Sequence, residues 1–106
     1  TAISKEEAEK LKAEAAQNAE VDKRKRELAE ARNLADNLIY AAEKGLRDAG
    51  DKVSNEIKQS IQEKISQLKS VKDGDDLEAI RAKSEALSQE LQKIGTQMYG
   101  QKTDQG

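Results

Sequence analysis

The absence of proline is the feature that most constrains how this chain can fold. None of the 106 residues is a proline, and only six are glycines. Because proline inside a helix removes a backbone hydrogen bond and clashes with the preceding turn, its absence permits helices along nearly the whole chain. Apolar residues recur at intervals of three and four, the spacing of one helix face. The sequence therefore predicts an all-α fold.

Three segments carry an apolar stripe of this kind, at residues 28–49, 57–71 and 77–98. Gly50 and the Asp-Gly-Asp-Asp run at 73–76 predict the breaks between them. Two short connections between amphipathic helices imply antiparallel neighbours, so we expect an antiparallel three-helix bundle. The predicted core positions are Leu28, Ala31, Ala35, Leu38, Ala42, Leu46, Ala49, Ile57, Ile61, Ile65, Leu68, Val71, Leu77, Ile80, Ser84, Leu87, Leu91, Ile94 and Met98.

Polar residues before each stripe predict where the helices begin. Ser4 and Ser54 are expected N-caps, and Asp75 followed by Glu78 resembles a capping box. The final helix is expected to end at Tyr99-Gly100.

Two positions within that final helix depart from a regular apolar stripe. Ser84 is the one polar residue of its stripe and could bond to its own backbone. Gly95 predicts a bend between two shorter helices.

The first helix exceeds the length of its partners. A helix over 19–49 would span about 45 Å at ~1.5 Å per residue, against about 28 Å for 54–72. Residues before Leu28 should then project as a long N-terminal helical arm, for which an external partner is expected because an isolated helix is marginal in water. Gln17-Asn18 suggests either a kink or a break. We therefore divide the chain into a short helical arm segment (1–18), a long helix plus bundle (19–100) and a flexible tail (101–106).

Composition excludes several kinds of chemistry. The chain has neither histidine nor cysteine, which removes imidazole and thiolate catalysis and the usual zinc sites. The Asp-rich run at 73–76 lacks the ligand spacing of an EF-hand. No desolvated carboxylate pair is indicated, so we expect no catalytic residue and no metal site.

Charge and hydropathy limit the partners. Nineteen basic residues balance 21 acidic ones, for a net charge of −2. A Lys-Arg-Lys-Arg run at 23–26 is surrounded by acids and is best interpreted as a solvated helix face, so neither a nucleic acid nor a membrane is expected as a partner. Because the chain starts at Thr1, we expect it to be a fragment of a longer protein.

A second face of the first helix has the composition of a docking surface. Ala29, Asn33, Asp36 and Tyr40 follow one another at helical spacing beside the apolar stripe. Small and neutral polar residues with one acid and one tyrosine suit a specific interface. The equally weighted alternative is that Asp36 forms an intrahelical pair with Arg32, four residues earlier.

The sequence resembles a known family. Residues 22–40, DKRKRELAEARNLADNLIY, are similar to the lid helix of the DnaK family of chaperones (heat shock protein 70). The segments GDDLEAI at 74–80 and LQKIG at 91–95 resemble later parts of the same lid. The similarity spans residues 3–99 in order.

This resemblance implies a lid that closes over unfolded peptide held by a β-sandwich, under ATP and ADP control, in protein folding and the stress response. Asp36 would be the latch that pairs with a basic group on the β-sandwich, with Tyr40, Asn33, Arg32 and Ala29 around it. ATP and magnesium would bind to the parent's ATPase domain and no cofactor to this fragment, which would not be an enzyme. The parent's co-chaperones, a bacterial source and a cytoplasmic location are also implied.

The alternative function is a generic helical scaffold or self-associating module, which the sustained apolar spacing at 77–98 favours. A tight dimer through the arm would support it. A weak homodimer of the isolated fragment would instead fit a lid without its natural partner.

Overall fold

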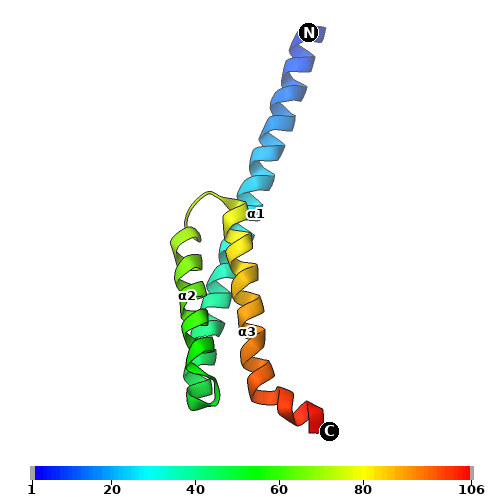
Figure 1. The fold of residues 1–106 in the computed structure, drawn as a ribbon. Coiled ribbons are helices and arrows are strands. Elements are labelled where there is room, and N and C mark those ends of the chain that lie inside the picture. Colours follow the sequence, from blue (N-terminus) through cyan, green and yellow to red (C-terminus); the bar gives the residue numbers. More distant parts are fainter. Residues whose placement is uncertain (1, 106) are drawn as a thin grey trace.

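The structure, a computed structural model, describes residues 2–105, with side-chain burial for residues 2–98. It consists of helix α1 (Lys5–Ala49), a 3-10 turn η1 (Gly50–Lys52), helix α2 (Asn55–Val71) and helix α3 (Leu77–Gln105). Residues 2–105 contain no strand. Helix α2 runs back along the lower part of α1, and α3 then returns in the direction of α1 (Figure 1). The predicted all-α antiparallel bundle is confirmed.

The core is an aliphatic cluster between the three helices. Its largest fully buried side chains come from α2 and α3, whereas α1 contributes chiefly alanines. Small side chains on α1 let the other two helices approach it closely. The buried apolar residues are Ala31, Ala35, Ile39, Ala42, Ala49, Val53, Ile61, Ile65, Leu68, Leu77, Ile80, Leu87 and Ile94.

The buried face of α1 differs slightly from the predicted stripe. Ile39 is only 6% exposed although it was not among the predicted core positions, while Leu38 and Leu46 are only partly buried. The shift arises because both α2 and α3 pack on α1, so that the buried face is wider than a single apolar stripe and includes Ile39. Val53, in the connection after η1, is also buried.

Two of the predicted helix caps are confirmed. The Ser4 hydroxyl accepts a hydrogen bond from the Glu7 amide at 3.1 Å, and Ser54 accepts one from Ile57 at 3.3 Å. The predicted capping box at Asp75 is wrong, because α3 starts one residue later. Its first turn is capped by Asp76, whose carboxylate accepts from the Ala79 amide at 3.0 Å.

Helix α1 continues without a break through Gln17 and Asn18, so the boundary drawn after residue 18 falls inside one helix. Every residue from 2 to 26 is exposed, including Ile3, Leu11 and Val21. The arm extends away from the bundle, and the molecule measures 76 Å in its longest dimension (Figure 1). The predicted projecting arm is therefore confirmed.

Helix α3 departs from expectation at Ser84 and at Gly100. Ser84 is 3% exposed, but its hydroxyl has no hydrogen-bond partner in the described residues, so the expected bond to its own backbone is absent. The helix passes through both Gly95 and Gly100 to Gln105, so the predicted end at Gly100 is wrong. Its axis changes direction in the C-terminal, orange to red part, in keeping with the predicted bend, although it is not divided into two helices (Figure 1). Glycine costs a helix only ~0.5–1 kcal/mol relative to alanine and no proline follows it. The predicted flexibility of 101–106 concerns side chains outside the described residues.

Candidate docking face on α1

The predicted docking residues lie on the part of α1 that packs against the bundle. Ala29, Asn33, Asp36 and Tyr40 are all exposed, and Tyr40 retains 57% of its accessible surface. The alanines on the neighbouring side of the helix are buried against α2 and α3. The core packing therefore fixes the rotation of α1 and leaves these four side chains accessible. We call them the docking face.

Asp36 is held by an ion pair with the end of α2. Its carboxylate lies 2.9 Å from Nζ of Lys72, the C-cap residue of α2, and the Asp36 side chain remains 55% exposed. Lys72 also contacts Asp73 at 3.2 Å. The pKa of Lys72 is raised above its ordinary value, mainly by its hydrogen bond to Asp36 and next by its hydrogen bond to Asp73. No spacing rule within one helix could have found Lys72, because the tertiary fold brings it to Asp36.

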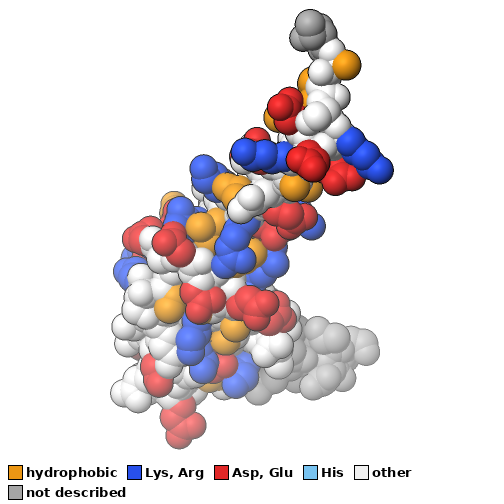
Figure 2. Space-filling view, turned by 90° about the horizontal axis from the view of Figure 1, so that it is seen from above, with side chains coloured by type: hydrophobic (Ala, Val, Ile, Leu, Met, Phe, Trp, Pro, Cys, Tyr) orange, Lys and Arg blue, Asp and Glu red, His pale blue; other side chains and the backbone are white. Residues whose placement is uncertain are grey.

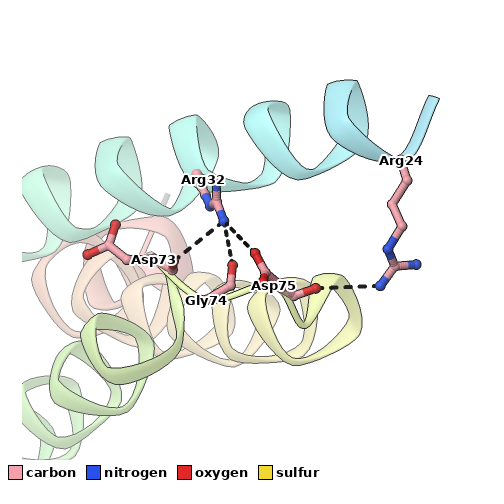
Figure 3. A network of polar contacts seen from close by, with 5 residues as sticks. All are labelled: Arg24, Arg32, Asp73, Gly74 and Asp75. Carbon is pink, nitrogen blue, oxygen red and sulfur yellow. Dashed lines mark hydrogen bonds and ion pairs between the residues drawn. The ribbon is translucent and has the colours of Figure 1, made fainter. Parts of the chain in front are cut away.

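Arg32 is engaged elsewhere and does not pair with Asp36. Its guanidinium donates to the Gly74 carbonyl at 2.7 Å and more weakly to the Asp73 carbonyl at 3.4 Å. It also contacts the Asp75 carboxylate at 3.3 Å. Figure 3 shows these three contacts converging on one guanidinium nitrogen. The intrahelical Arg32–Asp36 pair considered from the sequence is therefore not formed.

The basic run at 23–26 contributes to the same turn. Arg24 lies 3.5 Å from the Asp75 carbonyl, at the limit of a hydrogen bond (Figure 3). Lys23 lies 4.0 Å from Glu27 within the helix. Lys23 thus lies on a solvated helix face next to an acidic residue, as predicted. Arg24 instead extends to the α2–α3 turn. We call the contacts of Arg24, Arg32 and Asp36 with residues 72–75 the turn clasp.

Further ion pairs join the exposed edges of the bundle. Glu43 of α1 pairs with Lys69 of α2 at 3.1 Å, and Glu27 pairs with Arg81 of α3 at 3.7 Å. Exposed ion pairs typically contribute only ~0–1 kcal/mol each. These contacts fix the relative positions of the helices, while the aliphatic core provides most of the stability.

The described residues contain neither a candidate metal centre nor a helix that could span a membrane. Among them, no group of three or more histidine, cysteine or acidic residues could hold a metal ion. None of the helices in residues 2–105 has the length and hydropathy needed to cross a bilayer. Charged side chains of both signs are spread over the visible face between uncharged polar and backbone atoms, and hydrophobic ones appear as separate small patches (Figure 2).

Fold and surface together define a helical-bundle domain with a projecting helix and an exposed, largely polar face on α1. The comparison with protein families gives a more specific assignment. The family model described as Hsp70 protein matches residues 1–100. The chain therefore belongs to the Hsp70 family and has a chaperone-related role.

Proposed function

We propose that this chain is the helical lid of a DnaK-type Hsp70 chaperone from a bacterium. It closes over unfolded peptide bound to a β-sandwich and opens under the control of ATP. One observation carries the proposal. Helix α1 has 45 residues, and every residue of its first half is exposed, so its apolar side chains there are not buried within this chain. A helix of that kind gains stability when another surface packs against it.

The docking face supports the same role. Asp36, Asn33 and Tyr40 present an acid, an amide and a phenol to an incoming surface, and the acid suits a basic partner. Asp36 is the latch of the proposed lid, while Arg32 holds the α2–α3 turn in place behind it. Because Lys72 already pairs with Asp36, closure requires Asp36 to share or exchange that partner.

The remaining parts of the proposal concern the parent protein. The ATPase domain binds ATP and magnesium, and this chain takes part in neither binding nor hydrolysis. The β-sandwich and the ATPase domain are its intramolecular partners, and peptides and co-chaperones act through them. The proposed location is the cytoplasm, with no nucleic acid or membrane partner.

The test is peptide release from the full-length chaperone that carries this chain, measured with a fluorescent peptide in ADP. Asp36→Asn should accelerate dissociation about fivefold, the effect of losing roughly 1 kcal/mol of a charged contact. Asp48→Asn is a matched control, because Asp48 is an exposed α1 aspartate that forms an ion pair with Lys44 on the same helix. Unchanged release by Asp36→Asn would refute the latch.

A second pair of variants tests the exchange of partners. Lys72→Met frees Asp36 and should slow peptide release, because the competing internal partner is gone. Lys69→Met removes an equivalent α2 lysine that pairs with Glu43 and should leave release unchanged. If Asp36→Asn accelerates peptide release but the two lysine variants release peptide at the same rate, Asp36 is the latch but does not exchange Lys72 for another partner.

A further inference from the structure

A groove runs between α1 and α3 on the face of the bundle that α2 does not cover. One hollow of about 350 Å³ is lined by Leu34, Leu38, Arg81, Ser84, Glu85 and Ser88. A second, of about 190 Å³, shares three of these residues and adds Glu27, Glu30 and Ala31. Because Leu34, Arg81 and Ser84 line both, the two hollows form one groove. No residue of α2 belongs to the described lining.

The walls of this groove are incompletely buried. Leu34 keeps 53% of its surface exposed in the middle of a helix that otherwise buries its neighbours Ala31 and Ala35. Leu38, one turn further along, is only partly buried. Partly exposed aliphatic side chains at the edge of a core are removed from water when another apolar side chain packs between them, which is favourable. The groove therefore favours an occupant with an aliphatic side chain.

Ser84 provides an independent sign of a missing partner. The residue is 97% buried and lines both hollows, yet its hydroxyl is unpaired among the residues the structure describes. Buried hydroxyl groups in native proteins almost always have a hydrogen-bond partner. Because the hydroxyl oxygen is covered, an occupant with a polar group would supply that partner only by displacing the side chains above it.

The charges around the groove indicate the sign of the charge that an occupant should carry. Glu27, Glu30 and Glu85 lie among the lining residues, and Arg81 is the one basic residue in the described lining. Arg81 is already paired with Glu27 at 3.7 Å. The groove is thus acidic overall and suits an occupant with lysine or arginine beside its apolar side chains.

We propose that the α1–α3 groove binds an amphipathic helix of a partner protein, with an aliphatic side chain between lysine or arginine residues. Helices α1 and α3 run in the same direction on either side (Figure 1). A helix placed between them would complete a four-helix arrangement, a common way for a helical groove to recognise a partner. The site differs from the docking face, because Leu34 lines a hollow together with α3 residues whereas Asp36 pairs with Lys72 at the end of α2.

The test is a titration of the isotope-labelled 106-residue chain with designed peptides, followed by amide chemical shifts. The probe has leucine at i, i+3, i+4 and i+7 and lysine elsewhere, and a matched peptide replaces lysine with glutamate. The lysine peptide should shift the amides of Leu34, Leu38, Ser84 and Ser88. The glutamate peptide should bind at least ~10-fold more weakly.

Three variants make the test specific to the groove. Leu34→Asn should lower the affinity for the lysine peptide about 10-fold or more, and Ser84→Ala should lower it about 3-fold. Leu11→Asn changes an equally exposed arm leucine, also 53% exposed, and should leave the affinity unchanged.

The proposal would be overturned if Leu11→Asn and Leu34→Asn reduced the affinity for the lysine peptide equally. It would also be overturned if the peptide changed only the amide chemical shifts of the arm. Groove shifts that appear on concentrating the chain alone would assign the groove to a second copy and overturn it as well.

Discussion

At the scale of single residues, two serines show how the surroundings of a hydroxyl decide its effect on stability. Ser60 of α2 donates a hydrogen bond to the Glu90 carboxylate of α3, and so connects the two helices. Ser84 of α3 is more deeply buried and has no partner among the described residues. A buried polar group without a hydrogen-bond partner destabilises the fold, because nothing replaces its lost contacts with water. A hydrogen bond within the protein offsets that loss.

We therefore expect opposite effects from the same substitution at the two serines. Ser84→Ala should raise the free energy of unfolding by about 1 kcal/mol, since it removes an unpaired hydroxyl. Ser60→Ala should lower it by about 1 kcal/mol, since it removes a made hydrogen bond. Urea denaturation of the 106-residue chain measures both changes. Destabilisation by Ser84→Ala would mean that the hydroxyl has a partner in solution.

Glu90 gives the bundle a dependence on pH. The Ser60 hydroxyl, and to a lesser extent Lys93 at 3.1 Å, lower the pKa of Glu90 below its ordinary value, and burial opposes them. A carboxyl group whose pKa is lower in the folded than in the unfolded state contributes stability above its unfolded pKa. That contribution is lost as the pH falls through the folded pKa.

The prediction is a difference between wild type and Glu90→Gln. As the pH falls from neutral to below the ordinary glutamate pKa of about 4.3, wild type should lose more stability than Glu90→Gln. Thermal unfolding at a series of pH values gives the comparison. Parallel pH profiles for the two proteins would show that Glu90 titrates alike in the folded and unfolded states.

At the scale of secondary-structure elements, glycine serves two different purposes in this chain. Gly50 ends α1 with a φ of 53°, a conformation that side chains with a Cβ rarely adopt. Gly95 lies inside α3, and a Cβ placed there would meet no atom within 4 Å. The first glycine is required by the backbone, whereas the second only lowers the helical propensity of its element.

Alanine should accordingly have opposite effects at these two glycines. Gly95→Ala should stabilise the chain by about 0.5–1 kcal/mol, because it reduces the entropy of the unfolded state and fits the helix. Gly50→Ala should destabilise it by about 1 kcal/mol or more, because φ is positive there. Denaturant midpoints measure both. A destabilising Gly95→Ala would indicate that Gly95 adopts a non-helical conformation in solution.

At the scale of the whole molecule, the arm dominates the shape. The radius of gyration is 21.6 Å, compared with about 13 Å for a compact domain of this length. The excess comes from the exposed half of α1, which the turn clasp and the core hold at one end only. Helix α1 is thus a core element in its second half, while its first half is available to the partner domain of the proposed lid.

Small-angle scattering tests this shape and the state of association together. At low concentration we expect a radius of gyration near 21.6 Å, with an apparent mass close to the 11.7 kDa of one chain. A weak homodimer, predicted for a lid without its partner, should appear only as the concentration rises. A tight dimer throughout the series would instead favour a self-associating scaffold.

The helices and the class of fold could be predicted because they depend on local properties of the chain. The period of the apolar residues, the lack of proline and the glycine at position 50 act within a few residues. The projecting arm followed from comparing helix lengths. The exposure of Ala29, Asn33 and Tyr40 followed from their position beside the apolar stripe.

Only the tertiary structure decided which partners the polar residues have. Lys72 and Asp36 are far apart in sequence, and the return of α2 along α1 brings them together. The same folding turns Arg32 to the carbonyls of the α2–α3 turn and leaves the Ser84 hydroxyl, beside a groove, without a partner among the described residues. Helix formation depends on neighbours along the chain, whereas each of these contacts depends on the packing of two helices, which local spacing does not encode.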